Sequence, residues 1–421
     1  MANSFQAVRG FNDILPQQAA AWQKLEATLK QIVNLYAYQE VKLPIVEQTS
    51  LFKRTIGAVT DIIEKEMYTF TDLNGDSLSL RPEGTAGCVR AAIENGMLRQ
   101  VQKLWYQGPM FRHEKPQKGR YRQFHQFGVE LFGLPEIAAE LELLVMTQRM
   151  WERLGLADSV NLEVNTLGSS EERQIFKADL QLYFQQKSAA LTDEEKQRLQ
   201  KNPLRLLDSK AEHMQILIQE APKLIDYIST SSLDHFNLLC SGINSLGINF
   251  KLNPCLVRGL DYYHDLVFEW TTPLLGSQAT VCAGGRYNGL VAQLGGPQVP
   301  AVGFAIGLER ILLLQEQQAN NCPDIFIVTQ EQQPLVKSFQ IAELIREQTA
   351  WSVEMCLAAG SFKSQFKKAD KSGAKIAIIL GNDELQANKV CVKLLRQENH
   401  EQYLLNCAEL INWLHNHGKE L

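Results

Sequence analysis

Two segments of alternating apolar and polar residues flank a basic loop, and this pattern predicts a β-hairpin. They form the two ends of LWYQGPMFRHEKPQKGRYRQFHQFGVELFG, residues 104–133, with Pro116 and Gly119 marking the loop. Successive strand side chains point to opposite faces. One face of the second strand carries Arg122, Phe124, Gln126, Gly128 and Glu130, and the other carries Phe127, Val129 and Leu131. Because polar groups on a buried face need partners, the first face is predicted to form the floor of a ligand site.

Positive charge is concentrated around this loop. Residues 99–122 contain seven basic residues and one acidic residue, a net charge of +6, whereas the whole chain carries −5. The overall charge argues against a generic nucleic-acid coat protein, so a polyanion would bind to local patches. The alternative is a solvated, lysine-rich hairpin, but that interpretation leaves Gln126 and Glu130 unexplained.

Length and composition predict a globular protein of two or three domains, since the 421 residues are 45% hydrophobic and 21% charged. No apolar run approaches the roughly 20 residues of a membrane span, and the N-terminus lacks the apolar centre of a signal peptide. We therefore expect a cytoplasmic protein with no membrane partner. The eight cysteines include no CxxC pair, which predicts reduced thiols and no metal site.

The order of the predicted elements indicates an α+β fold, with helices packed on an antiparallel sheet, followed by a small α/β domain. Ser169 and Glu172 form a capping-box pattern at the start of a polar helical segment, which we interpret as an insertion. The predicted divisions are a first domain over 1–168 and 250–314, a helical insertion over 169–249, a linker over 315–323 and a C-terminal domain over 324–421.

Several elements of the first domain can be predicted individually. The patterns indicate helices over about 16–36 and 137–154, a hairpin turn at Asn74-Gly75, and strands over 255–271 and 280–287. An apolar helix is expected after Gly307.

Arg112 and Phe124 suit a nucleotide site. The arginine fork can hold a phosphate in two places, and a phenyl ring can stack on a base. Taken singly, Arg112 could form a surface ion pair and Phe124 could belong to the core. Their occurrence beside Gln126 and Glu130 favours a binding site.

Glu83 and Thr85 flank a glycine in the segment RPEGT, where they could present acceptors to an ammonium group. The alternative interpretation, which is compatible with the first, makes Thr85 the N-cap of a helix.

Two further segments carry arginines beside glycines. In LVRGLDYY, residues 256–263, Arg258 stands between apolar residues and so needs an anionic partner, although Tyr262 and Tyr263 could belong to the core. In GFAIGLER, which ends at Arg310, the glycine spacing is a weak signal that matches neither a Walker loop nor a dinucleotide fingerprint.

Together these segments resemble those of the bacterial class II histidyl-tRNA synthetases over the whole chain. Motif 1 of that class resembles the first helix with the strand ending at Pro44, motif 2 resembles FRHE at 111–114 with Phe124, and motif 3 resembles GLER at 307–310. The histidine-specific signatures of the family are similar to LRPEGT at 80–85, the strand over 126–130, and LVRGLDYY.

This resemblance implies a class II catalytic domain, an α/β anticodon-binding domain and a homodimer. It also implies ATP-dependent ligation of L-histidine to tRNA-His through a histidyl-adenylate, with release of pyrophosphate and then AMP. The family uses Mg²⁺ held largely by the ATP phosphates, which needs no cage of protein ligands.

The resemblance also assigns roles to individual residues. The implied catalytic residues are Arg112, Arg258 and Arg310. The implied ATP site comprises Arg112 at the α-phosphate, Phe124 on the adenine, Arg310 on the opposite side, and Glu114 and Arg120. In the implied histidine site, Glu83, Thr85 and Gln126 hold the amino group, and Glu130 and Tyr263 bind the imidazole nitrogens. Arg258 approaches the carboxylate and the α-phosphate, Tyr262 lines the pocket, and Arg112 also belongs to this site.

For the anticodon-binding domain, Lys363, Lys367 and Lys371 would form a cationic stripe on one helix face, although a solvated lysine face is an equal alternative. The main alternative function is a non-catalytic, histidine-binding regulatory subunit of ATP phosphoribosyltransferase. Arg112, Phe124, Arg310 and the C-terminal domain argue against it. Glu130 and LVRGLDYY disfavour a class II synthetase for proline, threonine or glycine.

Overall fold

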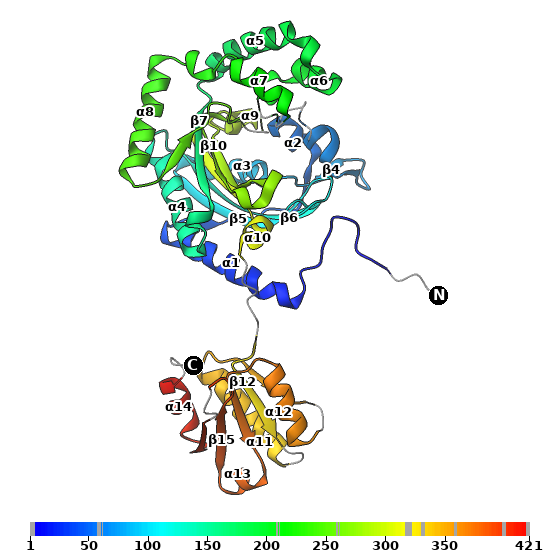
Figure 1. Ribbon diagram of the computed structural model, residues 1–421, viewed down its shortest axis with the longest axis vertical. Helices are drawn as coiled ribbons and strands as arrows, with labels where there is room; N and C mark the ends of the chain where they lie inside the picture. The colour runs from blue at the N-terminus through cyan, green and yellow to red at the C-terminus, as the bar shows by residue number, and fades with distance from the viewer. Residues whose placement is uncertain are drawn as a thin grey trace. The chain divides into compact units, whose positions relative to one another are not determined.

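The protein forms two compact units, Met1–Gln318 and Ala319–Leu421 (Figure 1). The computed structural model describes residues 5–56, 60, 62–207, 209, 211–257, 260, 262–315, 322–329, 333–357, 360–397 and 401–417. The division between the units falls in the polar segment predicted to be a linker. The boundaries proposed for the helical insertion remain a prediction.

The first unit is built on an eight-stranded sheet. Its strands, in spatial order, are β1 (Gln39–Glu40), β5 (Gln102–Phe111), β6 (Gln123–Phe132), β11 (Ala301–Gly307), β10 (Thr280–Arg286), β9 (His264–Thr271), β7 (Asn161–Thr166) and β8 (Phe250–Leu252). The two edge pairs, β1–β5 and β7–β8, are parallel, and every other pair is antiparallel. The sheet is therefore mixed, and the prediction of an antiparallel sheet is right only for its centre.

One sequence-based strand prediction is wrong at its start. A strand was expected from Cys255, but β9 begins at His264. The reason is local: the Asn253 side chain accepts a hydrogen bond from the Cys255 amide at 3.0 Å, which stabilises a turn after Pro254. Tyr262 and Tyr263 consequently precede the strand instead of lying in it.

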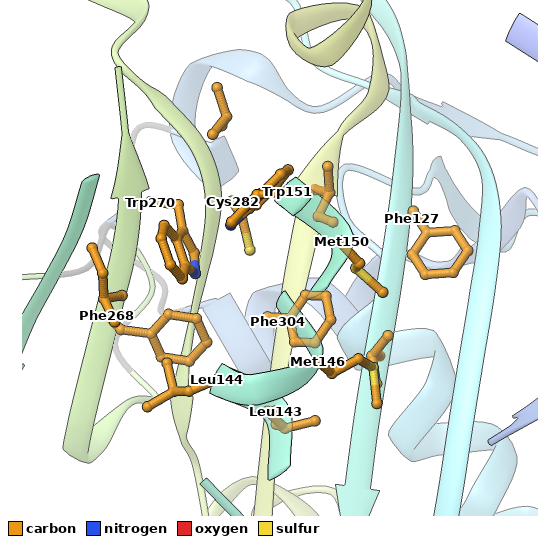
Figure 2. Packing of buried hydrophobic residues seen from close by; sticks show 14 of the residues in the cluster. Phe127, Leu143, Leu144, Met146, Met150, Trp151, Phe268, Trp270, Cys282 and Phe304 are labelled. Atoms are coloured by element: carbon orange, nitrogen blue, oxygen red, sulfur yellow. The ribbon is translucent and has the colours of Figure 1, made fainter. Parts of the chain in front are cut away.

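Helices cover one face of this sheet and bury its largest apolar cluster. They are α1 (Pro16–Leu35), α4 (Ala138–Leu154), α8 (Thr230–Ser245) and α10 (Leu308–Leu314). Figure 2 shows Met150 and Trp151 of α4 beside Phe304 and Trp270 of the sheet, and the two indole rings meet edge to face at 5.8 Å. Phe127, which the alternation assigned to the apolar face, lies in this cluster.

The opposite face of the sheet contributes to the other large apolar cluster, together with α3 (Thr85–Glu94) and α9 (Leu290–Gln293). Residues of α5 (Ser170–Gln186), α6 (Asp193–Lys201) and α7 (Glu212–Glu220) extend this cluster. The predicted capping box is confirmed, because the Ser169 hydroxyl accepts from the Glu172 amide at 3.2 Å and the Glu172 carboxylate accepts from the Ser169 amide at 2.7 Å. In Figure 1, α5, α6 and α7 lie together at one end of this unit.

A small antiparallel sheet and one more helix complete the first unit. The elements are β2 (Val46–Gln48), α2 (Thr49–Ile56), β3 (Thr69–Thr71) and β4 (Ser77–Leu80). β4 is the middle strand. The predicted turn at Asn74-Gly75 joins β3 to β4, and the Asp72 carboxylate accepts from the Asn74 amide at 2.8 Å.

The second unit has a five-stranded sheet. Its strands, in spatial order, are β13 (Val353–Met355), β12 (Ile325–Thr329), β14 (Ile376–Leu380), β15 (Lys389–Leu394) and β16 (Gln402–Asn406). Its helices are α11 (Gln333–Gln348), α12 (Phe362–Lys371), α13 (Asn382–Gln386) and α14 (Leu410–His417). The first three strands are parallel, as the predicted βα alternation requires, whereas β15 and β16 form an antiparallel extension that was not predicted. No described helix combines the length and apolarity needed to span a membrane.

Candidate active site

A pocket of about 280 Å³ lies over the β5–β6 hairpin and gathers most of the predicted site residues. Those that line it are Glu83, Thr85, Arg112, Glu114, Arg120, Phe124, Gln126, Tyr262, Tyr263 and Arg310. Glu130 lies outside the lining, and Arg258 falls outside the residues that the structure describes. Segments more than 200 residues apart in sequence therefore meet in one cavity.

Three arginines, Arg112, Arg120 and Arg310, line the end of the pocket beside the hairpin loop, together with Glu114, Glu269 and Glu309. The Arg112 guanidinium lies 5.3 Å from the centre of the Phe124 ring, and its Nε donates to the Pro82 carbonyl at 2.9 Å. Arg310 approaches from α10 and donates to the Gly119 carbonyl at 3.2 Å. Burial, and then the nearby charge of Arg120, lower the pKa of Arg310. Arg112 and Arg310 donate to backbone carbonyls, which leave their charge in place, so this end of the pocket favours a ligand with negative charge.

Glu83 caps the helix that borders the other end of the pocket. Its carboxylate accepts hydrogen bonds from the amides of Thr85, at 2.6 Å, and Ala86, at 2.9 Å. Helix α3 begins at Thr85 with Gly84 as its N-cap, so the alternative prediction that Thr85 itself is the N-cap is wrong. Burial raises the pKa of Glu83, while the two amide hydrogen bonds lower it. When it is ionised, this carboxylate has lone pairs left for a ligand ammonium.

Gln126 supplies a buried acceptor in the wall of the pocket. Its Oε1 is buried and has no hydrogen-bond partner among the described residues. A buried polar atom without a partner costs roughly 1–3 kcal/mol, so the position favours a ligand that donates a hydrogen bond there. Of the side chains that line the pocket, this amide gives the clearest indication that a donor binds.

Glu130 lies directly behind this wall and is only 1% exposed. Its Oε1 accepts from the Thr85 hydroxyl at 2.8 Å and the Tyr106 hydroxyl at 3.1 Å, and its Oε2 accepts from the Tyr287 hydroxyl. Burial raises the pKa of Glu130 to about 8, against the lowering effect of the hydroxyl donors. A carboxyl group in this environment changes charge close to neutral pH.

Sequence reasoning missed the two tyrosines that contact Glu130. Tyr106 pairs with Gly128 in the β5–β6 register, so a glycine opposite a tyrosine on the polar face was the available signal. Tyr287 follows β10, and no local pattern marks it.

Glu309 was also left without a role. Its carboxylate accepts from the backbone amide of His125 at 2.9 Å and pairs with the His125 ring at 2.9 Å, which ties the start of α10 to β6. Glu309 belongs to the GLER segment, so its place in that motif was the available signal.

Two family models, taken together, and a curated relative match this chain over most of its length. The family model "Histidyl-tRNA synthetase" matches residues 10–311, and the model "Anticodon binding domain" matches residues 325–417. The chain is 53% identical over 424 residues to the histidine–tRNA ligase of Legionella pneumophila strain Paris, and the match covers 99% of each protein.

Solved structures show the same architecture. The apo histidyl-tRNA synthetase of S. aureus matches with a TM-score of 0.81 and 32% identity, covering 97% of this chain and 99% of that one. A Bacillus halodurans protein, described as an ATP phosphoribosyltransferase regulatory subunit/histidyl-tRNA synthetase, matches with a TM-score of 0.65 and 21% identity. That match covers 91% of this chain and all of the other, and it shows a shared fold only.

Proposed function

The chain belongs to the histidyl-tRNA synthetase family, and we propose that the pocket over the β5–β6 hairpin is where L-histidine and ATP react. The enzyme is a class II aminoacyl-tRNA synthetase that ligates L-histidine to tRNA-His. It first forms histidyl-adenylate and pyrophosphate, and then transfers histidine to the tRNA and releases AMP. The observation that carries the assignment of the pocket is the unpaired, buried Oε1 of Gln126, which suits the ammonium group of an amino acid.

In the first step the histidine carboxylate attacks the α-phosphorus of ATP, and pyrophosphate leaves on the opposite side. Negative charge spreads over the phosphoryl oxygens in the transition state, so fixed cations stabilise it. Arg112 is assigned to the α-phosphate, with its guanidinium held in place by Pro82. Phe124 would stack on the adenine, and Arg310 would support the nucleotide from the other side. Glu114 and Arg120, an ion pair in the pocket wall, would complete the ATP site.

Histidine would bind at the other end of the pocket. Glu83, Thr85 and Gln126 would receive its amino group, and their positions around one cavity support that role. Glu130 and Tyr263 are assigned to the imidazole nitrogens. Tyr262 lines the same end, while Arg258 keeps its proposed role at the carboxylate through the family resemblance alone.

The residues around the pocket fit an ATP-bound Mg²⁺ rather than a protein-held one. Among the described residues no group of three or more His, Cys, Asp or Glu could hold a metal ion. The pocket carboxylates are already engaged: Glu309 binds His125, Glu114 pairs with Arg120, and Glu269 accepts from Thr280 at 2.7 Å. Glu114 and Glu269 would contact the water ligands of an ion held mainly by phosphates, which would neutralise phosphate charge.

The second step and the remaining partners also belong to the proposal. A ribose hydroxyl of the terminal adenosine of the tRNA attacks the adenylate, and a phosphate oxygen of the adenylate is the proposed base. The second unit would bind the anticodon, where Lys363, Lys367 and Lys371 lie exposed on α12. We further propose a homodimer formed through α1 and a cytoplasmic location.

The test is ATP–pyrophosphate exchange with purified, folded protein. Exchange should depend on L-histidine and be absent with proline, threonine or glycine, the substrates of the related class II alternatives. If histidine supported no exchange, the assignment of the pocket would fail and the regulatory-subunit alternative would replace it. If proline, threonine or glycine supported exchange as well as histidine does, the histidine site proposed around Glu130 would be wrong.

A further inference from the structure

A buried hydroxyl network lies behind the wall that is proposed to bind histidine. Three hydroxyl groups from three separate elements converge on Glu130: Thr85 from the start of α3, Tyr106 from β5, and Tyr287 from the loop after β10. Thr85 lines the pocket, whereas Glu130, Tyr106 and Tyr287 do not. Tyr106 and Tyr287 are therefore a second layer around Glu130, the residue assigned to the imidazole, and Thr85 joins this network to the pocket wall.

The backbone leaves space for one of these tyrosines. A Cβ atom at Gly84 would come within 2.0 Å of the Tyr106 ring, and one at Gly128 within 2.2 Å. Gly303, opposite Glu130 in the register, would likewise place a Cβ 1.8 Å from Oε2. Three glycines thus make room for the ring of Tyr106 and the carboxyl group of Glu130. Packing alone would accept phenylalanine, so the hydroxyl of Tyr106 is the group that needs a chemical explanation.

Tyr287 links the same carboxyl group to the aromatic side of the pocket. Its ring centre lies 5.6 Å from that of Tyr262 and 6.3 Å from that of Tyr263, and both of those tyrosines line the cavity. Its hydroxyl donates to Oε2 of Glu130, the oxygen that Thr85 and Tyr106 do not contact. Glu130 is thereby held from both oxygens.

We propose that Tyr106 and Tyr287 are positioning residues for histidine recognition, because their hydroxyls fix the orientation of the Glu130 carboxyl group behind the histidine pocket. This inference rests on the proposed function and adds two residues that do not touch the ligand. Once Glu130 is ionised, its carboxylate has about four lone-pair sites, and the three hydroxyls occupy three of them. One lone-pair direction of Glu130 is left to accept from a ligand, so the network fixes the orientation of the carboxylate as well as supplying its charge.

The charge of Glu130 depends on the same two hydroxyls. Tyrosine donors stabilise the ionised carboxylate, and they lower a pKa that burial raises. Removal of either hydroxyl should raise the pKa of Glu130 further. A purely structural role for the tyrosines would leave the pH dependence of histidine use unchanged.

The experiment compares Tyr287→Phe and Tyr106→Phe with a matched control, Tyr38→Phe. Tyr38 is also buried and donates to a glutamate, Glu142, at 2.8 Å, but it does not line the pocket. Above pH 8, where Glu130 is ionised, loss of one hydrogen bond to its carboxylate should raise KM for histidine in pyrophosphate exchange by about ten- to hundred-fold. KM for ATP should stay within about two-fold in all three variants, because the basic end of the pocket is unchanged.

Two further readouts separate recognition from general damage. β-(2-Thienyl)alanine, an aromatic analogue without ring nitrogens, should keep its inhibition constant in the Tyr287→Phe variant while histidine loses affinity. The pH profile of kcat/KM for histidine should move to higher pH in Tyr287→Phe and Tyr106→Phe, and not in Tyr38→Phe.

The outcomes separate the inference from the proposed function. If wild-type protein exchanges pyrophosphate with histidine but both network variants match Tyr38→Phe, the inference is overturned and the function stands. If the network variants bind histidine, the analogue and ATP more weakly by the same factor, the tyrosines have only a structural role and the inference also fails. Absence of exchange in the wild-type protein would contradict the proposed function itself.

Discussion

Glu130→Gln should make the free energy of unfolding of the first unit less sensitive to a rise in pH. The wild-type carboxyl group is 1% exposed, and burial raises its pKa to about 8 from an ordinary value of 4.5. Glutamine has nearly the same shape and no charge at any pH. The substitution therefore removes the titration while leaving the packing around Gly303 almost unchanged.

The sign of the effect follows from proton linkage. Between pH 4.5 and 8 the folded protein keeps a proton on Glu130 that the unfolded chain has lost, so stability falls as pH rises. The stabilisation is complete below about pH 4.5 and is lost as the pH passes through 8. At about 1.4 kcal/mol per pH unit, the wild-type protein should lose roughly 2–3 kcal/mol between pH 6 and pH 8 through this group. Glu130→Gln should lose none of it.

Urea unfolding at pH 6, 7 and 8, followed by tryptophan fluorescence, measures the difference. Four of the six tryptophans belong to the first unit, so the signal reports mainly on the unit that contains Glu130. Other titrating groups are common to both proteins and cancel when the two pH profiles are subtracted. Parallel profiles for wild-type and Glu130→Gln would refute the reasoning, because they would mean that Glu130 has the same pKa in the folded and unfolded states.

Two more predictions concern other parts of the chain. Arg286→Ala should lower the free energy of unfolding by about 3–5 kcal/mol, since it leaves the Glu140 carboxylate, which is 0% exposed, without its cationic partner. Urea unfolding measures this loss, and a loss below about 1 kcal/mol would contradict a paired, buried charge. Lys367→Ala should reduce the slope of log K for tRNA binding against log salt concentration by about one and should slow tRNA charging, while histidine-dependent pyrophosphate exchange is unchanged. An equal loss of exchange would argue against an anticodon-binding role for this face.

The sequence predicted the elements whose signal is local. The β5–β6 hairpin follows from strict alternation, and α5 follows from its capping box at Ser169. The pocket residues Arg112 and Gln126 were also predicted from the sequence, because a buried sheet face would normally carry apolar side chains at such positions. In these cases short-range steric and hydrogen-bonding preferences decide the structure.

The errors and omissions come from long-range packing. The edge strands β1 and β8 add parallel pairs to the sheet because neighbouring segments dock there, which no local pattern reveals. Tyr287 is recognisable only once the loop after β10 is known to lie beside Glu130, 157 residues away in sequence. Pairing of this kind depends on the register of several strands at once.

The polar face of β6 changes its environment along its length, and this change suits the two ligands. At the loop end, Phe124 and Arg112 are only partly buried, so this end suits the entry of ATP and the release of pyrophosphate. Two positions further, Gln126 already has a buried oxygen, and Glu130 is enclosed by hydroxyls. Hydrogen bonds discriminate most strongly where water cannot replace a missing partner. In the proposed arrangement, a single strand places charge neutralisation at its open end and the selection of the imidazole at its dry end, which is why the loss of one buried hydroxyl should affect histidine and spare ATP.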